Sequence, residues 1–234
     1  MIALPSPTIV FDLDGTLVDT APDLAATLNV VLTRHRIPPV TLDFVRPLIG
    51  HGAAALIEKG LREEKGLREA LVGVGDAQLK GMLVEFLEHY EANIAVDSRP
   101  FDGVVAALER FQSDGYRLAV CTNKRENLSK KLLDTLDISS FFAAIAGPDT
   151  FHVQKPDPQH ILKTLEAAGG HAARAVMIGD SKNDILAAQA AGIPVIAVDF
   201  GYTPEPVSKF KPDHIVSHYD EIVPLVRAAF AESA

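Results

Sequence analysis

Two aspartates stand at the end of a short apolar run near the start of the chain. Thr8–Phe11 has the β-branched and aromatic residues of a buried strand, and Asp12, Asp14 and Gly15 follow it directly. Because successive strand residues point to opposite faces, we expect Asp12 and Asp14 on one side, with Leu13 packed behind them. Two such carboxylates repel each other unless a cation intervenes, and hard oxygen ligands suit Mg²⁺. The spacing predicts a magnesium site that also tolerates a phosphate.

Two other interpretations of this acidic stretch can be weighed. An Asp-rich turn that caps a helix is the simpler alternative, and such turns are common. A calcium-binding EF-hand loop is excluded, because its sixth position must be Gly and is Leu17 here. A predicted strand rather than a helix also precedes the acids.

Residues of complementary chemistry follow three later predicted strands. Thr122 and Asn123, with helix N–H groups beside them, could hold a phosphate, although either could instead cap the next helix. Lys155 precedes a rigid Pro-Asp-Pro segment and supplies the cation that clustered acids require. Asp180 leaves its strand at the same edge of the sheet as Asp12, which is where a third metal ligand would lie.

The role of Asp184 stays open between two possibilities. Ser181 and Asp184 have the spacing of a capping box for a helix over Ile185 to Ala191, which Gly192 would end. Asp184 could equally support the metal ligands from behind. A similar capping box is predicted for Thr20 and Asp23 at the start of an earlier helix.

Composition limits the class of protein. The 234 residues are 47% hydrophobic and 23% charged, which fits a globular fold, and no apolar run approaches the ~20 residues of a membrane span. The net charge of −9 argues against nucleic acid as a partner. Cys121 is the only cysteine, so no internal disulfide is possible. The start of the chain lacks the basic residues of a secretory signal, so we expect a cytoplasmic protein without membrane contact.

The order of elements predicts an α/β fold with an inserted helical domain. Between residues 19 and 96 every periodic segment is helical, whereas short apolar strands alternate with helices beyond Pro100. The later strands are predicted at Arg117 to Cys121, Ala143 to Ala146, Ala175 to Ile178, Val195 to Val198 and His214 to Val216, with helices at Phe101 to Asp114 and Arg125 to Leu136. This alternation indicates a Rossmann-like parallel sheet. We therefore expect a core of residues 1–18 and 97–234 and a helical cap of residues 19–96.

Taken together, four motifs resemble those of the haloacid dehalogenase superfamily, in its order and over nearly the whole chain. They are Asp12 to Asp19 (DLDGTLVD), Thr122-Asn123, Lys155-Pro156 and Gly179 to Asp184 (GDSKND). The inserted segment resembles that superfamily's four-helix (C1-type) cap. Within the superfamily, the stretches Ile49 to Gly52 and Cys121 to Lys124 are most similar to those of phosphoglycolate phosphatases.

The resemblance implies a magnesium-dependent phosphomonoester hydrolase acting on a small phosphorylated metabolite. Asp12 would form a phosphoaspartyl intermediate, while Asp14 would protonate the leaving alkoxide and later deprotonate water. Mg²⁺ would be held by the Asp12 carboxylate, the Asp14 backbone carbonyl and Asp180. Lys155 would help to neutralise the charge between nucleophile and phosphate. Thr122 and Asn123 would hold the transferring oxygens.

Several alternatives remain open at this stage. Another sugar-phosphate phosphatase, or a phosphomutase similar to β-phosphoglucomutase, would carry the same motif residues. A non-enzymatic receiver module that is phosphorylated on an aspartate is a more distant possibility. His51, between two glycines, is a candidate contact for the distal group of the substrate, and a solvated loop histidine is the alternative. The chain could be a monomer or a homodimer, because periodicity does not tell which apolar faces a second chain would cover.

Overall fold

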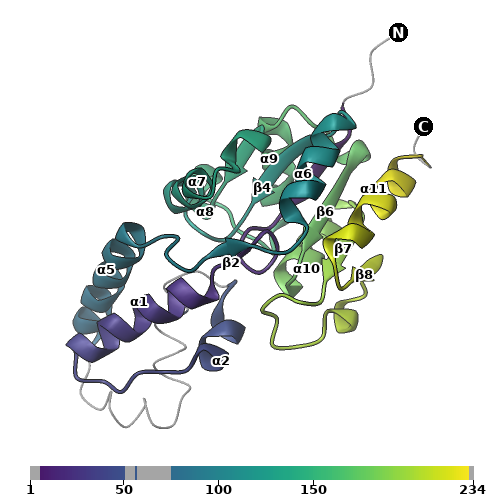
Figure 1. Ribbon diagram of the computed structural model, residues 1–234. Coiled ribbons are helices and arrows are strands. Elements are labelled where there is room, and N and C mark those ends of the chain that lie inside the picture. Colours follow the sequence, from purple (N-terminus) through teal and green to yellow (C-terminus); the bar gives the residue numbers. More distant parts are fainter. Residues whose placement is uncertain (1–5, 51–55, 57–74, 232–234) are drawn as a thin grey trace.

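A parallel sheet of six strands lies at the centre of the computed structural model, which describes residues 6–50, 56 and 75–231 (Figure 1). The spatial order of the strands is β5-β4-β1-β6-β7-β8. Their bounds are β1 Thr8–Phe11, β4 Arg117–Cys121, β5 Ala144–Ala146, β6 Ala175–Gly179, β7 Val195–Val198 and β8 His214–Val216. All neighbouring pairs are parallel. The carboxyl ends of β1, β4 and β6 therefore meet at one edge of the sheet.

Helices cover both faces of the sheet. Successive side chains of β1 point to opposite faces and all of them are buried, so both faces need a cover. Ile9 and Phe11 belong to the larger core cluster with α6 and α11, whereas Val10 belongs to the second cluster with α9 and α10. The helices of this part of the chain are α6 Val104–Ser113, α7 Glu126–Thr135, α8 Pro148–Phe151, α9 Pro158–Ala167, α10 Lys182–Ala191 and α11 Ile222–Ala231. Among the described residues, no helix has both the length and the apolar character to cross a membrane.

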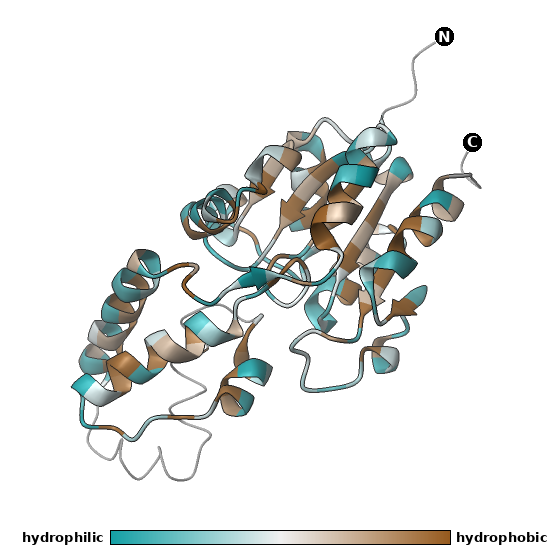
Figure 2. Cartoon of the chain, viewed as in Figure 1, coloured by the Kyte–Doolittle hydropathy of each residue, from teal (hydrophilic) through white to brown (hydrophobic). Residues whose placement is uncertain are grey.

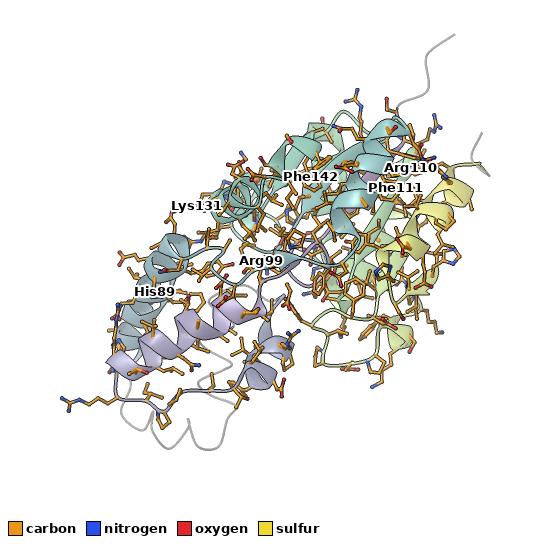
Figure 3. All side chains as sticks on the ribbon, in the orientation of Figure 1. His89, Arg99, Arg110, Phe111, Lys131 and Phe142 are labelled. Carbon is orange, nitrogen blue, oxygen red and sulfur yellow. The ribbon has the colours of Figure 1, made fainter. Side chains whose placement is uncertain are left out.

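Aromatic side chains fill the core beneath the end of β1. The Phe11 ring lies 6.3 Å from that of Phe111 on α6 and 6.2 Å from that of Phe142, measured between centroids. Phe111 and Phe142 are labelled in Figure 3. Phe11 immediately precedes Asp12, so close packing of this ring fixes the point at which the acids leave the sheet.

The predicted strands agree with the observed ones, and the helix starts differ for identifiable reasons. Four strands (β1, β4, β7 and β8) have the predicted bounds, and β5 and β6 differ from them by one residue. Helix α6 begins at Val104 rather than at Phe101, because Gly103 precedes it with φ of +83°, a left-handed conformation that an α-helix does not contain. Helix α10 begins at Lys182 because Ser181 caps it.

The inserted segment contributes only helical elements to the part of the chain that the structure describes. These are α1 Ala21–Arg34, α2 Leu42–Val45, the 3₁₀ turn η1 Arg46–Leu48 and α5 Asp76–Ala92. The apolar faces of α1 and α5 pack together, and both helices stand away from the sheet (Figures 1 and 2). The complete four-helix bundle and its boundaries stay predictions, since residues 51–55 and 57–74 lie outside the described residues.

A short antiparallel ribbon joins the inserted segment to the sheet domain. Its strands are β2 Val18–Asp19 and β3 Arg99–Pro100, with Val18 opposite Pro100 and Asp19 opposite Arg99. The two crossings of the chain are thus tied to each other by backbone hydrogen bonds rather than left as separate linkers.

The capping box predicted for Thr20 and Asp23 is wrong. Thr20 is the residue before α1, but its hydroxyl donates to Asp14 Oδ1 at 2.7 Å and caps no helical N–H. The Asp23 carboxylate instead accepts hydrogen bonds from the Ser98 N–H at 2.8 Å, the Ser98 hydroxyl at 2.6 Å and the Asp97 N–H at 3.0 Å. Tertiary partners therefore outcompete the local cap for both side chains.

Replacing Asp23 should destabilise the chain markedly. Asp23 is buried, so Asp23→Ala leaves the Asp97 and Ser98 donors without their acceptor and should lower the free energy of unfolding by about 2–4 kcal/mol, measured by urea denaturation. Asp43→Ala is the matched control, because Asp43 is an exposed helical aspartate. Its effect should stay within about 0.5 kcal/mol. Equal midpoints for the two variants would contradict this role of Asp23.

Candidate active site

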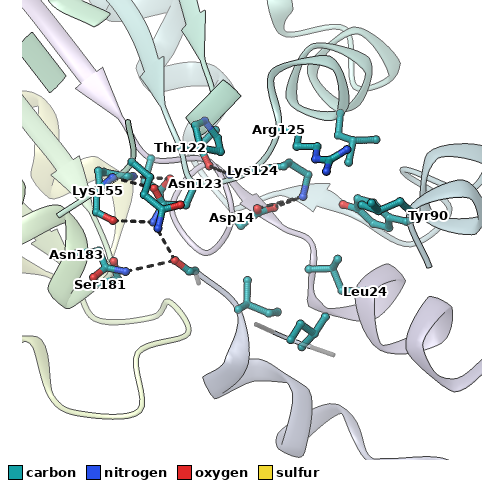
Figure 4. A pocket seen from close by; sticks show the side chains of 18 of the residues that line it. Asp14, Leu24, Tyr90, Thr122, Asn123, Lys124, Arg125, Lys155, Ser181 and Asn183 are labelled. Atoms are coloured by element: carbon teal, nitrogen blue, oxygen red, sulfur yellow. Dashed lines mark hydrogen bonds and ion pairs between the residues drawn. The ribbon is translucent and has the colours of Figure 1, made fainter. Parts of the chain in front are cut away.

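Both predicted acids at the end of β1 line one cavity (Figure 4). Asp12 is 5% and Asp14 9% exposed, while Leu13 between them is fully buried. Gly15 follows with φ of +85°, and a Cβ atom there would lie 2.5 Å from Asp180 Oδ2. Only glycine therefore lets the chain turn this tightly against the end of β6.

A cluster of three buried carboxylates, called here the acid cluster, lies at the ends of β1 and β6. Asp12, Asp180 and Asp184 each place an oxygen within 4.8 Å of the others. Asp180 is fixed by two donors, the Thr16 hydroxyl at 3.0 Å and the Tyr202 N–H at 2.8 Å. These hydrogen bonds aim the carboxylate at the other two acids.

Lys155 is the counter-ion of the acid cluster. Its Nζ lies 2.8 Å from Asp12 Oδ1 and 2.5 Å from Asp184 Oδ1, and its side chain is 2% exposed. Burial alone would lower the pKa of Lys155, but Asp12 and Asp184 outweigh burial and raise it, so the ammonium stays charged. The predicted juxtaposition of Lys155 with the acids is present in the structure.

The electrostatics of the acid cluster fit a divalent cation. Burial, followed by the charge of Asp184, raises the pKa of Asp12 to about 7 despite the opposing effect of Lys155. Burial and the neighbouring Asp184 and Asp12 likewise raise the pKa of Asp180 well above its usual value. One lysine therefore does not offset three buried acids, and an all-oxygen donor set of this charge suits Mg²⁺.

Asp184 fills the capping role that the sequence left open, while its support of the metal ligands stays a prediction. Its Oδ2 accepts hydrogen bonds from the Ser181 N–H at 2.9 Å and the Ser181 hydroxyl at 2.6 Å, which completes the predicted capping box of α10. Its other oxygen binds Lys155. The helix start and the acid cluster thus share one carboxylate.

Thr122 and Asn123 lie at the cavity but do not cap α7. The residue that precedes α7 is Arg125, so the capping alternative is excluded for both side chains. The Asn123 side chain accepts from the Lys155 N–H at 3.0 Å and donates to the Lys155 carbonyl at 3.1 Å. Asn123 therefore holds the backbone of Lys155, and its role in binding phosphate stays a prediction.

A second buried lysine, Lys124, lies at the site and is not among the residues predicted from the sequence. Lys124 Nζ lies 2.9 and 3.1 Å from the two oxygens of Asp14 and 4.7 Å from the ring centroid of Tyr90 on α5 (Figure 4). Lys124 directly follows Thr122 and Asn123, so its place at a strand end was the available signal. Tyr90 could not have been found, because nothing in the sequence connects it with β4.

Apart from Tyr90, the side chains that line the cap side of the cavity are apolar in the part of the inserted segment that the structure describes. The volume is about 210 Å³, and the described residues of the inserted segment that line it are Leu24, Ile49, Gly50, Leu56, Leu83, Phe86, Leu87 and Tyr90. The Gly50 carbonyl accepts hydrogen bonds from Asn123 and Asn183, each at 3.3 Å. The candidate contact His51 lies outside the described residues, so its role stays a prediction.

The fold and the site together indicate the protein family of this chain. The chain belongs to the haloacid dehalogenase-like hydrolases, whose family pattern it matches over residues 9–198. The resemblance stated from the sequence motifs is thereby confirmed.

Individual relatives of the chain carry the same name, phosphoglycolate phosphatase. A phosphoglycolate phosphatase of Mesorhizobium japonicum is 47% identical over 95% of this chain and 98% of its own length. One from Caulobacter vibrioides is 44% identical over 94% of this chain and 90% of its own. The crystal structure of a predicted phosphoglycolate phosphatase from Haemophilus somnus, 30% identical, superposes with a TM-score of 0.88 over 94% of this chain and 97% of that one.

Magnesium should stabilise the protein through the acid cluster. In a thermal melt, Mg²⁺ at about a hundredfold excess over its dissociation constant should raise the midpoint by about 5–10 °C. Asp180→Asn should abolish this rise, because it removes one of the three clustered carboxylates. The control Asp199→Asn, an exposed aspartate just beyond β7, should keep it. A full rise in Asp180→Asn would place the metal elsewhere.

Proposed function

We propose that this chain is a Mg²⁺-dependent phosphatase that hydrolyses 2-phosphoglycolate through a phosphoaspartyl intermediate on Asp12. The observation that carries the proposal is the convergence of Asp12, Asp14 and Lys155 on one small cavity at the carboxyl edge of the sheet. The names of the relatives support the reaction and the substrate. The reaction class agrees with the hydrolase family to which the chain belongs.

The chemistry proceeds in two steps at phosphorus. An Asp12 carboxylate oxygen forms a bond to phosphorus while the bond to the ester oxygen breaks, and Asp14 gives its proton to the departing alkoxide. Asp14 then removes a proton from water, which attacks the phosphoaspartate and regenerates the Asp12 carboxylate with release of inorganic phosphate. Atoms and protons balance over the two steps, with glycolate and phosphate as products.

The remaining polar groups of the site position the phosphoryl group. Asp12, Asp180 and the Asp14 carbonyl would hold Mg²⁺, which supplies charge neutralisation between nucleophile and phosphate. Lys155 contributes a fixed positive charge beside Asp12. Thr122 and Asn123 would hold the transferring oxygens from the end of β4. Asp184 keeps Lys155 in place from behind.

The cavity favours a small substrate with few hydroxyl groups. Its volume of about 210 Å³ lies below the range of roughly 300–1,000 Å³ typical of sites for drug-sized ligands. A hexose phosphate would bring several hydroxyls against the apolar side chains of Leu24, Leu56 and Phe86, which offer no hydrogen bonds. The two-carbon acid avoids that cost. The expected cytoplasmic location, and the choice between monomer and homodimer, belong to this proposal as predictions for cell fractionation and sedimentation.

Phosphate release from a panel of esters tests the proposal. The wild-type chain with Mg²⁺ should release phosphate from 2-phosphoglycolate far faster than from a hexose phosphate, and a chelator should stop release. Asp12→Asn should lower the rate by about 10⁴-fold or more, because it removes the nucleophile. The control Asp220→Asn changes an exposed aspartate and should act like wild type.

The panel also separates the alternatives. Isomerised sugar phosphate without phosphate release would identify a phosphomutase, and a phosphoaspartate that persists for minutes without turnover would identify a receiver-like module. Equal rates across the panel would leave the phosphatase reaction in place and refute the glycolate assignment.

Asp14→Asn should separate the two steps. With p-nitrophenyl phosphate, whose phenolate leaves without a proton, the variant should release about one equivalent of phenolate per enzyme in a rapid burst and then stall, because water is no longer deprotonated. With 2-phosphoglycolate neither step should proceed at an appreciable rate. Stopped-flow absorbance measures the burst, and Asp12→Asn is the control that should lack it. Sustained turnover of both esters by Asp14→Asn would rule out this role.

A further inference from the structure

Two buried lysines pair with different carboxylates of the site. Lys155 serves Asp12 and Asp184 on the nucleophile side of the cavity. Lys124, which is 8% exposed, binds both oxygens of Asp14 at 2.9 and 3.1 Å. Asp14 is the residue proposed to protonate the ester oxygen, so Lys124 marks the side of the cavity on which the leaving group must lie.

Tyr90 adds a second donor at the same place. The residue is 1% exposed, and its hydroxyl has no hydrogen-bond partner of good geometry among the described residues. Figure 4 shows this hydroxyl on α5 pointing toward Lys124, whose Nζ lies 4.7 Å from the ring centroid. Burial raises the pKa of Tyr90 to about 12, so the group is an O–H donor at neutral pH. A buried, unpaired donor at a cavity costs free energy unless a ligand accepts from it.

The chemistry of the ligand follows from the position of these donors. In a phosphorylated 2-hydroxy acid, the carbon bonded to the ester oxygen also carries the carboxylate. When Asp14 contacts the ester oxygen, that carboxylate is brought close to the groups beside Asp14. The Thr20 hydroxyl there already donates to Asp14, which leaves the Lys124 ammonium and the neighbouring Tyr90 hydroxyl as donors for the ligand. The other side chains of the inserted segment that line the cavity, within its described residues, are apolar.

We infer that Lys124 and Tyr90 form the site that binds the carboxylate of the substrate and thereby selects phosphorylated 2-hydroxy acids over other phosphomonoesters. The inference rests on the proposed function. One donor comes from the end of β4 and the other from α5, so the carboxylate binds between the sheet domain and the inserted segment. Arg125 also lines the cavity but is exposed, so water screens its charge.

The test compares two esters that differ only in this group. Ethyl phosphate has a methyl group where 2-phosphoglycolate has its carboxylate, so the ratio of kcat/KM for the two esters measures recognition of the carboxylate. Lys124→Met should lower this ratio by about 10- to 100-fold, whereas Lys124→Arg should retain most of it. Arg125→Met is the matched control, a neighbouring cation of the same loop, and should change the ratio less than about threefold.

Tyr90→Phe keeps the ring and removes only the hydroxyl. It should lower the ratio by about tenfold, mainly through KM for 2-phosphoglycolate, and it serves as the deciding variant if Lys124→Met does not fold. Competitive inhibition by glycolate, measured with ethyl phosphate as substrate, should weaken in parallel in both variants.

Each other outcome has a definite meaning. If Lys124→Met slows both esters by the same factor, Lys124 acts only on Asp14 and the inference is overturned. If Arg125→Met loses the ratio instead, the carboxylate binds Arg125, and an unchanged ratio in Tyr90→Phe removes Tyr90 from the site. Failure of the proposed function looks different, because the wild-type chain would then release no phosphate from either ester.

Discussion

The placement of three carboxylates in a buried space beside a single lysine is the constraint on which the rest of the site depends. Lys155 reaches Asp12 and Asp184 together, and its own backbone is held by the side chain of Asn123. Asp184 in turn starts α10 through Ser181. Because desolvated charges are costly, removing Lys155 would leave Asp12 and Asp184 without a compensating charge. The ends of β1, β4 and β6 are therefore bound to one another by electrostatics as well as by the sheet.

Much of this arrangement could be predicted from the sequence, because the chemistry follows the strands directly. Each strand is a short apolar run whose end is marked by a polar residue, and parallel pairing brings such ends to one edge. Asp12, Asp14, Lys155 and Asp180 were therefore placed correctly relative to the sheet. The capping box at Thr20 failed because Asp14 and Ser98 offer Thr20 and Asp23 better partners than the helix does. A local sequence pattern does not show whether residues distant in the sequence will compete for the same hydrogen bonds.

The pairing of Lys124 with Tyr90 illustrates the part that sequence reasoning could not reach. Lys124 was visible in a motif, but its direction depends on how the inserted segment lies over the sheet. That geometry is set by the β2–β3 ribbon, by the contacts of Asp23 with the return crossing, and by the packing of α5 on α1. The ribbon and the contacts of Asp23 leave no periodic signal, and the apolar periodicity of α1 and α5 does not say which helix packs against which. The two residues proposed to select the substrate follow β4 and lie on α5, so their proximity becomes visible only once both elements are in place.

The carbonyl of Gly50 has a consequence of a different kind. Its oxygen accepts hydrogen bonds from Asn123, which follows β4, and from Asn183 at the start of α10 (Figure 4). A single atom of the inserted segment therefore contacts two elements of the sheet domain, and both contacts depend on the distance between those elements. Both contacts are 3.3 Å long, at the weak end of the hydrogen-bond range. Two weak hydrogen bonds of this kind define the position of Gly50 against the sheet domain and cost little free energy to break. The Asn123 side chain also holds the backbone of Lys155 through two hydrogen bonds. A movement of Gly50 would therefore shift Asn123 and, through it, the ammonium beside Asp12.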